Sequence, residues 1–350
     1  MSVSRKTAVV VCPGRGTYNK GELGYLRRHA RAYRDFLASA DAYRVAQGQV
    51  PVTELDGVKT FSSMHTRGQN ASPLIYACSF TDFLSIDADA IEVVAVTGNS
   101  MGWYSALACS GALSGEDGLA VVNTMGRYMD EANIGGQAIH GFLDEDWRPL
   151  PNRREQLLAL IADLHSPPSR HLYVSIELGG MLVVAGDAAG LDALEAAAPS
   201  GPGRFPMRLQ NHAAFHTPLQ ARVSDRAFTS PPDARFRQPD LPLVDGRGAI
   251  WRPGATDVQS LRDYTFGHQV VAPYDFTTAI HVCAREFAPE VFIVLGPGDT
   301  LGGAVAQALI AQNWRGLDSK TSFAERQAAS PVLVAMGRDD QRGHVVGELA

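Results

Sequence analysis

The chain has 350 residues, of which 45% are hydrophobic and 19% are charged, and its formal net charge is -6. This balance is ordinary for a globular protein and, without a long basic run, gives no support to a nucleic-acid binder. No segment approaches the roughly 18 apolar residues of a membrane-spanning helix, so we expect a soluble protein. The four cysteines form no C-x-x-C pair, and we expect them to be reduced thiols of a cytoplasmic protein.

Three short apolar runs end in glycine-bearing turns, namely Thr7–Cys12, Ile91–Val96 and Glu290–Leu295. Continuous apolar runs bounded by turns are typical of parallel strands that are buried on both faces. Helical patterns follow the second run, over Trp103–Cys109 and Ser114–Ala132. This strand–turn–helix order predicts an α/β fold with functional loops at the carboxyl ends of the strands.

The middle of the chain has a different pattern, β-α-β-β-α-β, which is typical of a ferredoxin-like unit. Its expected elements are a strand over Gln137–Leu143, a helix over Arg154–His165, a hairpin of His171–Leu178 and Met181–Gly186, a helix over Gly190–Ala198 and a strand over Arg204–Leu209. We therefore predict a large α/β domain of residues 1–134 and 211–317 and an inserted small subdomain of residues 135–210. Residues 318–350 are predicted to form a polar C-terminal tail, in which only Pro331–Met336 has the pattern of a structured segment.

The stretch Thr97–Leu107 contains the pattern G-x-S-x-G around Ser100, between an apolar run and a helix. A serine on a tight strand-to-helix turn has its hydroxyl pushed towards solvent and substrate. The following helix N-terminus offers free N–H groups to an oxyanion. The alternative is an inert serine that caps the helix, but the context favours a nucleophile.

A serine nucleophile needs a base, and residues 211–219, NHAAFHTPL, contain His212 and His216. Their spacing of four residues would suit half a metal site on a helix. Pro218 and the absence of H-E-x-x-H argue against metal binding. Both histidines could also be polar loop residues, which is the interpretation we prefer for His212.

Several blocks of the sequence resemble the malonyl-CoA:acyl-carrier-protein transacylases and the acyltransferase domains of polyketide synthases. GNSMGWYSALACSGALSGEDGLAVVNTMGRYM resembles the region of that family in which G-H-S-x-G-E-Y-x-A leads into two helices. CPGRGT (Cys12–Thr17) resembles the family's F-P-G-Q-G-S loop, and AAFHTPL (Ala213–Leu219) resembles H-A-F-H-S-P-L. With GGMLVVAG, QVVAPYDF and VLGPGDTLGG, the blocks span about residues 7–305 in the family's order.

The resemblance implies a hydrolase-like large domain with a mostly parallel sheet and an inserted ferredoxin-like subdomain. It makes Ser100 the nucleophile and His216 its general base and acid, steadied by the main-chain carbonyl of Gln269. The main-chain N–H groups of Met101 and Arg15 would form the oxyanion hole. The substrates would be an acyl-CoA and the phosphopantetheine thiol of an acyl carrier protein, and no metal or redox cofactor would be needed.

The expected acyl pocket departs from the family at Met125. Members that handle malonyl groups carry an arginine at that position of the second helix, which forms a bidentate pair with the free carboxylate. Arg127 lies two residues on, about 200° around the helix, and should face elsewhere. The missing arginine argues for an uncharged acyl group, or for hydrolysis of the acyl-enzyme in place of transfer. The alternative is that this short alignment has slipped and that malonyl-CoA is still used.

The other expected pocket residues are Asn99, Glu177 and Phe215. Asn99 replaces the family's histidine before the nucleophile, and Glu177 stands where the family has an asparagine and would repel a malonyl carboxylate. Arg15 replaces the glutamine of the P-G-Q-G loop and could pair with Glu177, supply a relocated carboxylate clamp or face solvent. Trp103 replaces an acidic residue and would narrow the entrance.

The leading hypothesis is a malonyltransferase-like enzyme that moves an acyl group between CoA and an acyl carrier protein in fatty-acid or polyketide biosynthesis. The second is an editing hydrolase that releases stalled acyl groups from carrier proteins, which Met125 favours. A non-catalytic docking subunit and an ordinary carboxylesterase are further alternatives. Carrier proteins are usually acidic, so Arg27–Arg34 and Arg153-Arg154 are candidate contacts, and neither a nucleic acid nor a membrane is expected as a partner.

Overall fold

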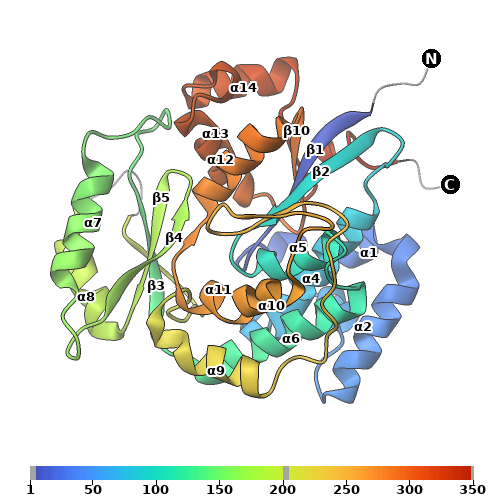
Figure 1. Cartoon of the computed structure of the whole chain (residues 1–350), viewed down its shortest axis with the longest axis horizontal. Coiled ribbons are helices and arrows are strands. Elements are labelled where there is room, and N and C mark those ends of the chain that lie inside the picture. The colour runs from blue at the N-terminus through green and yellow to red at the C-terminus, as the bar shows by residue number, and fades with distance from the viewer. Residues whose placement is uncertain (1–4, 200–204, 348–350) are drawn as a thin grey trace.

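Two β-sheets organise the part of the chain that the structure describes, residues 5–199 and 205–347 of a computed structural model (Figure 1). The larger sheet has the strand order β11 (Leu333–Ala335), β10 (Val291–Val294), β1 (Lys6–Cys12), β2 (Ile91–Gly98), β7 (Leu243–Val244) and β8 (Ile250–Trp251). Its neighbouring strands are parallel except for the last pair. The three apolar runs of the sequence are therefore adjacent parallel strands, and the α/β class is confirmed.

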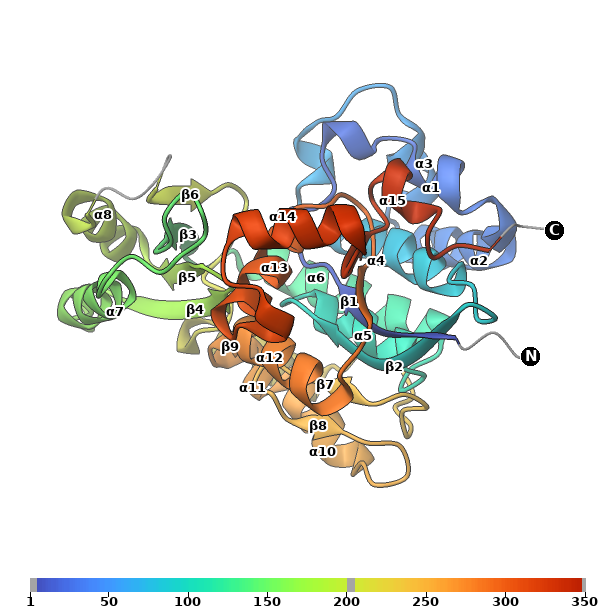
Figure 2. The same ribbon diagram turned by 90° about the horizontal axis from the view of Figure 1, so that it is seen from above.

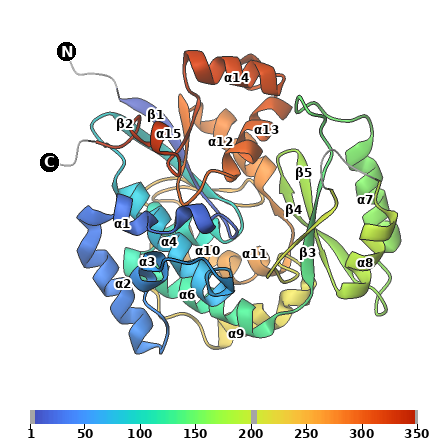
Figure 3. The same ribbon diagram turned by 180° about the vertical axis from the view of Figure 1, so that it is seen from behind.

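Helices lie on both faces of this larger sheet. α12 (Phe276–Phe287) is in front of the sheet in Figure 1, whereas α4 (Gly68–Leu84) is in front of it in the opposite view of Figure 3. The two helices that follow β2 are α5 (Gly102–Cys109) and α6 (Gly115–Ala132), which confirms the predicted pair. The other helices are α1 (Tyr25–His29), α2 (Arg34–Ala46), α3 (Val52–Gly57), α7 (Arg153–Leu164), α8 (Ala188–Ala197), α9 (Ala221–Thr229), α10 (Val258–Phe266), α11 (His268–Val271), α13 (Leu301–Ala311), α14 (Lys320–Ala329) and α15 (Asp339–Arg342).

The second sheet has the strand order β6 (Met207–Leu209), β3 (Gly136–Gly141), β5 (Met181–Gly186), β4 (Leu172–Leu178) and β9 (Tyr274–Asp275). The strands and helices predicted for the middle of the chain are present, although Arg204 of the last predicted strand lies outside the described residues. β9 comes from beyond the predicted subdomain, and it pairs in parallel with β4. The small sheet is thus completed by a strand that belongs to the returning chain.

Side chains of the small sheet alternate between two apolar environments. Leu182 and Val184 pack with α7 and α8 in a core of their own, because successive residues of a strand point to opposite faces. Val183, between them, joins the main core of the protein. Figure 2 shows α7 and α8 at one end of the molecule and α1 and α2 at the other. The free face of the small sheet is therefore turned towards the larger part.

The C-terminal segment is more structured than the sequence predicts. α14 and α15 form in the predicted polar tail, and β11 adds an edge strand to the larger sheet beside β10. The prediction that only Pro331–Met336 is structured is wrong: α14 buries none of its residues and α15 buries only Arg342. Polar contacts such as the hydrogen bond from the Thr321 hydroxyl to Asp146 are not revealed by local periodicity.

A buried ion pair holds this segment against the first helices. The Arg342 Nη1 lies 2.6 Å from the Oδ1 of Asp82, and the Oδ2 of Asp82 accepts hydrogen bonds from the Tyr25 hydroxyl at 2.7 Å and the Gly296 main-chain N–H at 2.8 Å. Burial raises the pKa of Asp82, and Arg342 opposes that rise.

Among the helices of the described residues, none combines the length and apolar composition of a transmembrane span.

We expect Arg342→Met to lower the free energy of unfolding by about 3–5 kcal/mol, because the Asp82 carboxylate would stay buried without its counterion. Urea denaturation at neutral pH measures the change. Arg338→Met is the matched control, since Arg338 makes only exposed ion pairs with Asp299 and Asp340, which are worth about 0–1 kcal/mol. Equal losses in the two variants would contradict this account.

Candidate functional site

Ser100 sits on a sharp turn between β2 and α5, with its backbone in the left-handed region at φ 56°. The two glycines of G-x-S-x-G make the turn possible by close packing. A β-carbon on Gly98 would lie 2.3 Å from the main-chain carbon of Gly102, and one on Gly102 would lie 2.2 Å from the carbonyl oxygen of Cys12. The main-chain N–H of Asn99 also donates to that carbonyl at 3.0 Å. The turn is therefore clamped to the end of β1.

His216 faces the serine from the segment that returns from the small sheet. Its Nε2 lies 2.7 Å from the Ser100 Oγ, and its Nδ1 lies 2.7 Å from the main-chain oxygen of Gln269. Because a carbonyl oxygen only accepts hydrogen bonds, Nδ1 carries the proton of the neutral ring. Nε2 is then left as the acceptor for the serine hydroxyl proton.

Burial keeps this histidine neutral. The side chain is 2% exposed, and desolvation lowers its pKa to about 4, although the hydrogen bond to Gln269 opposes the fall. His216 is also a left-handed residue, at φ 57°. A neutral, oriented imidazole at neutral pH is what general-base catalysis requires.

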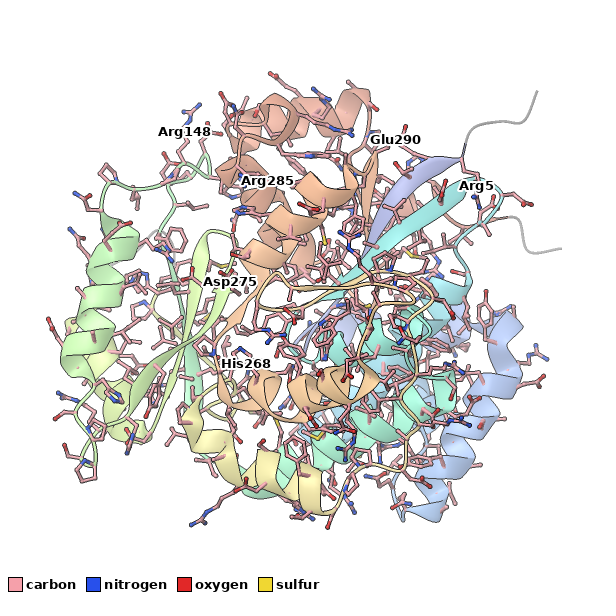
Figure 4. All side chains as sticks on the ribbon, in the orientation of Figure 1. Arg5, Arg148, His268, Asp275, Arg285 and Glu290 are labelled. Atoms are coloured by element: carbon pink, nitrogen blue, oxygen red, sulfur yellow. The ribbon has the colours of Figure 1, made fainter. Side chains whose placement is uncertain are left out.

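The side chain of Gln269 contacts the turn that carries the serine. Its Nε2 donates to the main-chain oxygen of Ser100 at 3.1 Å, and its Oε1 accepts from the Tyr104 hydroxyl at 2.9 Å. Tyr104 was given no role from the sequence, although it matches the tyrosine of the G-H-S-x-G-E-Y pattern. Gln269 belongs to the segment between His268 and Asp275, two residues labelled in Figure 4, and this segment passes beside the small sheet.

Two main-chain N–H groups flank Ser100 without a partner in the described part of the chain, those of Met101 and Arg15. Met101 immediately precedes α5. The loop that holds Arg15 lies against the turn that carries Ser100, because a β-carbon on Gly14 would lie 2.6 Å from the Asn99 carbonyl oxygen. Both predicted oxyanion donors are thus free and on the same side of the fold as the serine.

A small cavity of about 30 Å³ opens beside the serine and the histidine. Its walls are mostly apolar and include Met125 and Phe215, as predicted. They also include Met129, one helical turn after Met125 on α6, which the sequence did not single out. Arg15 is the one cation among the lining residues that the structure describes. About two water molecules would fill such a volume, so it suits a short acyl group.

A larger cleft of about 360 Å³ adjoins Ser100, between the turn that carries this serine and the face of the small sheet opposite α7 and α8. Ile176, Leu178 and Val183 line it, together with Asn99 and His212. Asn99 was predicted in the acyl pocket; it lines this cleft and not the small cavity. Its Oδ1 is buried and accepts no hydrogen bond from the described residues.

Two predicted positions are wrong. Glu177 lines neither cavity. Its neighbours Ile176 and Leu178 point into the cleft, so the Glu177 side chain points to the other face of β4. There its Oε1 lies 2.6 Å from the Nη2 of Arg154. The pair between Arg15 and Glu177, one of the three alternatives given for Arg15, is therefore absent from the described residues. Trp103 does not narrow an entrance; it is fully buried and donates to the Thr265 hydroxyl at 3.0 Å.

Two other side chains behave as the sequence suggests. Arg127 turns away from the cavity and lies 3.9 Å from the carboxylate of Glu131. His212 is a loop residue whose Nδ1 lies 2.7 Å from the Gln137 Oε1. Burial, with a smaller effect of Arg15, lowers the pKa of His212 to about 3.

The chain is similar to known acyltransferases in sequence. No protein-family model matches it. It is 24% identical over 242 residues to the malonyl CoA-acyl carrier protein transacylase of Bacillus subtilis, a match that covers 67% of this chain and 71% of that protein. It is 27% identical over 271 residues to the highly reducing polyketide synthase ausV of Aspergillus calidoustus, which covers 73% of this chain but only 10% of the synthase.

The fold is also similar to the folds of solved transacylases. The malonyl-CoA:acyl carrier protein transacylase of Xanthomonas oryzae pv. oryzae superposes with a TM-score of 0.74 at 19% identity, over 98% of both chains. The resemblance to the malonyl-CoA:acyl-carrier-protein transacylases is confirmed. Another transacylase-like structure, a malonyl-transacylase in complex with its type II polyketide synthase acyl-carrier protein, has a TM-score of 0.70 at 19% identity, over 87% of this chain and 93% of that one.

We expect His216 to titrate near pH 4, well below the ordinary value of about 6.5. Nuclear magnetic resonance of ring-labelled histidine measures this, and loss of the signal in His216→Gln assigns it. The Gln269→Ala variant keeps the main-chain carbonyl and should leave the titration near pH 4. A midpoint above pH 6 in the unmodified protein would show that the ring is not desolvated.

Proposed function

We propose that the chain is an acyltransferase that carries an acyl group from a CoA thioester to the phosphopantetheine thiol of an acyl carrier protein, through an ester on Ser100. The observation that carries this proposal is the 2.7 Å contact between the Ser100 Oγ and the His216 Nε2, with the Gln269 carbonyl fixing the tautomer. The similarity to transacylases, one of them solved with its carrier protein, supports the substrate classes.

In the first half-reaction, the Ser100 Oγ attacks the thioester carbonyl carbon while its proton passes to the His216 Nε2. The main-chain N–H groups of Met101 and Arg15 stabilise the oxyanion of the tetrahedral intermediate. The carbon–sulfur bond then breaks, and His216 returns the proton to the departing CoA sulfur. The products are the acyl-serine ester and the CoA thiol.

The second half-reaction runs in the opposite sense. The phosphopantetheine thiol gives its proton to the His216 Nε2, its sulfur attacks the ester carbonyl, and the proton returns to the Ser100 Oγ as the ester bond breaks. No metal or redox cofactor takes part in either step. We place this chemistry in the cytoplasm, where CoA thioesters are used.

The cleft of about 360 Å³ is the proposed route for the pantetheine arm. It runs from Ser100 between the two sheets, which we interpret as a hydrolase-like domain and its inserted ferredoxin-like subdomain. The apolar side chains of Ile176 and Leu178 would contact the methylene groups of the arm. The unpartnered Oδ1 of Asn99 would accept a hydrogen bond from one of its amide N–H groups.

An editing hydrolase on the same scaffold is the second candidate function, and Met125 in the cavity wall is the observation that favours it. In that case water would attack the acyl-serine in place of the thiol. The product mixture separates the two functions: acylated carrier protein indicates transfer, whereas free acid with a free carrier thiol indicates hydrolysis.

We expect an acyl adduct on Ser100 when the purified protein is mixed with short-chain acyl-CoA thioesters, as measured by intact mass and peptide mapping. Ser100→Ala should abolish the adduct, since no other hydroxyl of the described residues hydrogen-bonds to His216. Ser105→Ala is the matched control, because this buried serine lies on α5, directly after the turn of Ser100, and makes no side-chain hydrogen bond within the described residues. An adduct that persists in Ser100→Ala would refute the proposal.

A further inference from the structure

The side chain of Arg15 lines the small cavity, and its guanidinium lies beside the start of α4. Its Nη2 donates to the main-chain oxygens of Thr66 at 3.0 Å and Asn211 at 2.8 Å. A β-carbon on Gly68 would lie 3.4 Å from the Arg15 Nη1 and 3.0 Å from the Gly126 carbonyl oxygen. Gly68 thus packs between Arg15 and Gly126, the residue that follows Met125, and Arg15 and Gly126 both line the cavity that holds Ser100 and His216.

Among the described residues, no carboxylate lies at hydrogen-bond distance from this cation. Both of its hydrogen bonds use Nη2 and go to neutral carbonyls, so Nη1 and Nε donate to none of the residues that the structure describes. Burial lowers the Arg15 pKa to about 10, against the opposing effect of Asp130. The ring of Phe215, 5.3 Å from the guanidinium carbon, covers one side of the group. A half-buried cation with unused donors and no carboxylate partner is stabilised by an anionic ligand.

The other arginine and glutamate considered from the sequence do not compete for this role. Arg127 is on α6 but turns away to Glu131. Glu177 is held by Arg154 outside the cavity, so it neither neutralises Arg15 nor repels an anion there. The cavity thus presents one cation, unused N–H donors and no acidic side chain among its described lining residues.

We propose that Arg15 binds the free carboxylate of a short dicarboxylic acyl group on Ser100, and so replaces in function the arginine that Met125 displaces from α6. The inference rests on the proposed acyl transfer and names its substrate class: a CoA thioester with a second, ionised carboxyl group. The apolar side chain of Met125 brings no charge to the cavity wall, so the cation there comes from Arg15 in the loop after β1.

The test compares acylation rates with malonyl-CoA and acetoacetyl-CoA, which have nearly the same shape but differ in the terminal charge. We expect the unmodified protein to prefer malonyl-CoA. Arg15→Leu should slow acylation by malonyl-CoA by about 10- to 100-fold, the range expected for a lost charge-assisted hydrogen bond. Acylation by acetoacetyl-CoA should change by less than about threefold, because the main-chain N–H of residue 15 is retained.

Three further variants decide between binding and a structural role. Arg15→Gln, which keeps donors but not the charge, should show the same selective loss. The double variant Arg15→Leu with Met125→Arg returns a cation from α6 and should regain at least tenfold with malonyl-CoA. Arg127→Leu is the matched control, and it should leave both rates unchanged.

The outcomes separate this inference from the proposed function. Equal losses with both thioesters in Arg15→Leu would make Arg15 structural and overturn the inference. A preference of the unmodified protein for acetoacetyl-CoA would also overturn the inference about Arg15. The proposed function would still stand in that case, because Ser100 would have been acylated. If no thioester acylates Ser100, the proposed function fails and the inference fails with it.

Discussion

Gln269 joins the two halves of the site. Its main-chain oxygen accepts the His216 Nδ1 hydrogen bond, and its side-chain amide donates to the main chain of Ser100. Ser100 and His216 both have left-handed backbones, which cost about 1–2 kcal/mol each for residues with a side chain. Such conformations persist only where the surroundings determine them, and the contacts of Gln269, with the glycine packing of Gly98 and Gly102, do so here.

The sequence predicts the local parts of this arrangement well, because they depend on neighbours in the chain. The apolar runs of β1, β2 and β10 and the turn after β2 follow from short patterns. The approach of Ser100 and His216, 116 residues apart, does not follow from periodicity. From the sequence, only the resemblance of the blocks around Ser100 and His216 to one family indicated that the two residues lie together.

Side-chain partners were the least predictable feature, because they depend on which face of an element a residue occupies. A register irregularity in β4 between Val174 and Ile176 resets the alternation of that strand, and Glu177 consequently points away from the cleft. The polar C-terminal segment was misjudged for a similar reason: Arg342 is held by Asp82, 260 residues earlier in the chain. Neither pairing leaves a local trace in the sequence.

The cation that lines the cavity, Arg15, comes from the same loop as one of the proposed oxyanion donors. In the arrangement we propose, Arg15 contributes its main-chain N–H to the oxyanion hole and its guanidinium to the acyl carboxylate. The same cation covers Phe215, which directly precedes His216. Binding of the distal carboxylate would therefore orient the reacting carbonyl between donor and base. Binding energy used for orientation lowers the barrier of the chemical step, so a charge carried by this loop would act on the rate of acylation as well as on affinity.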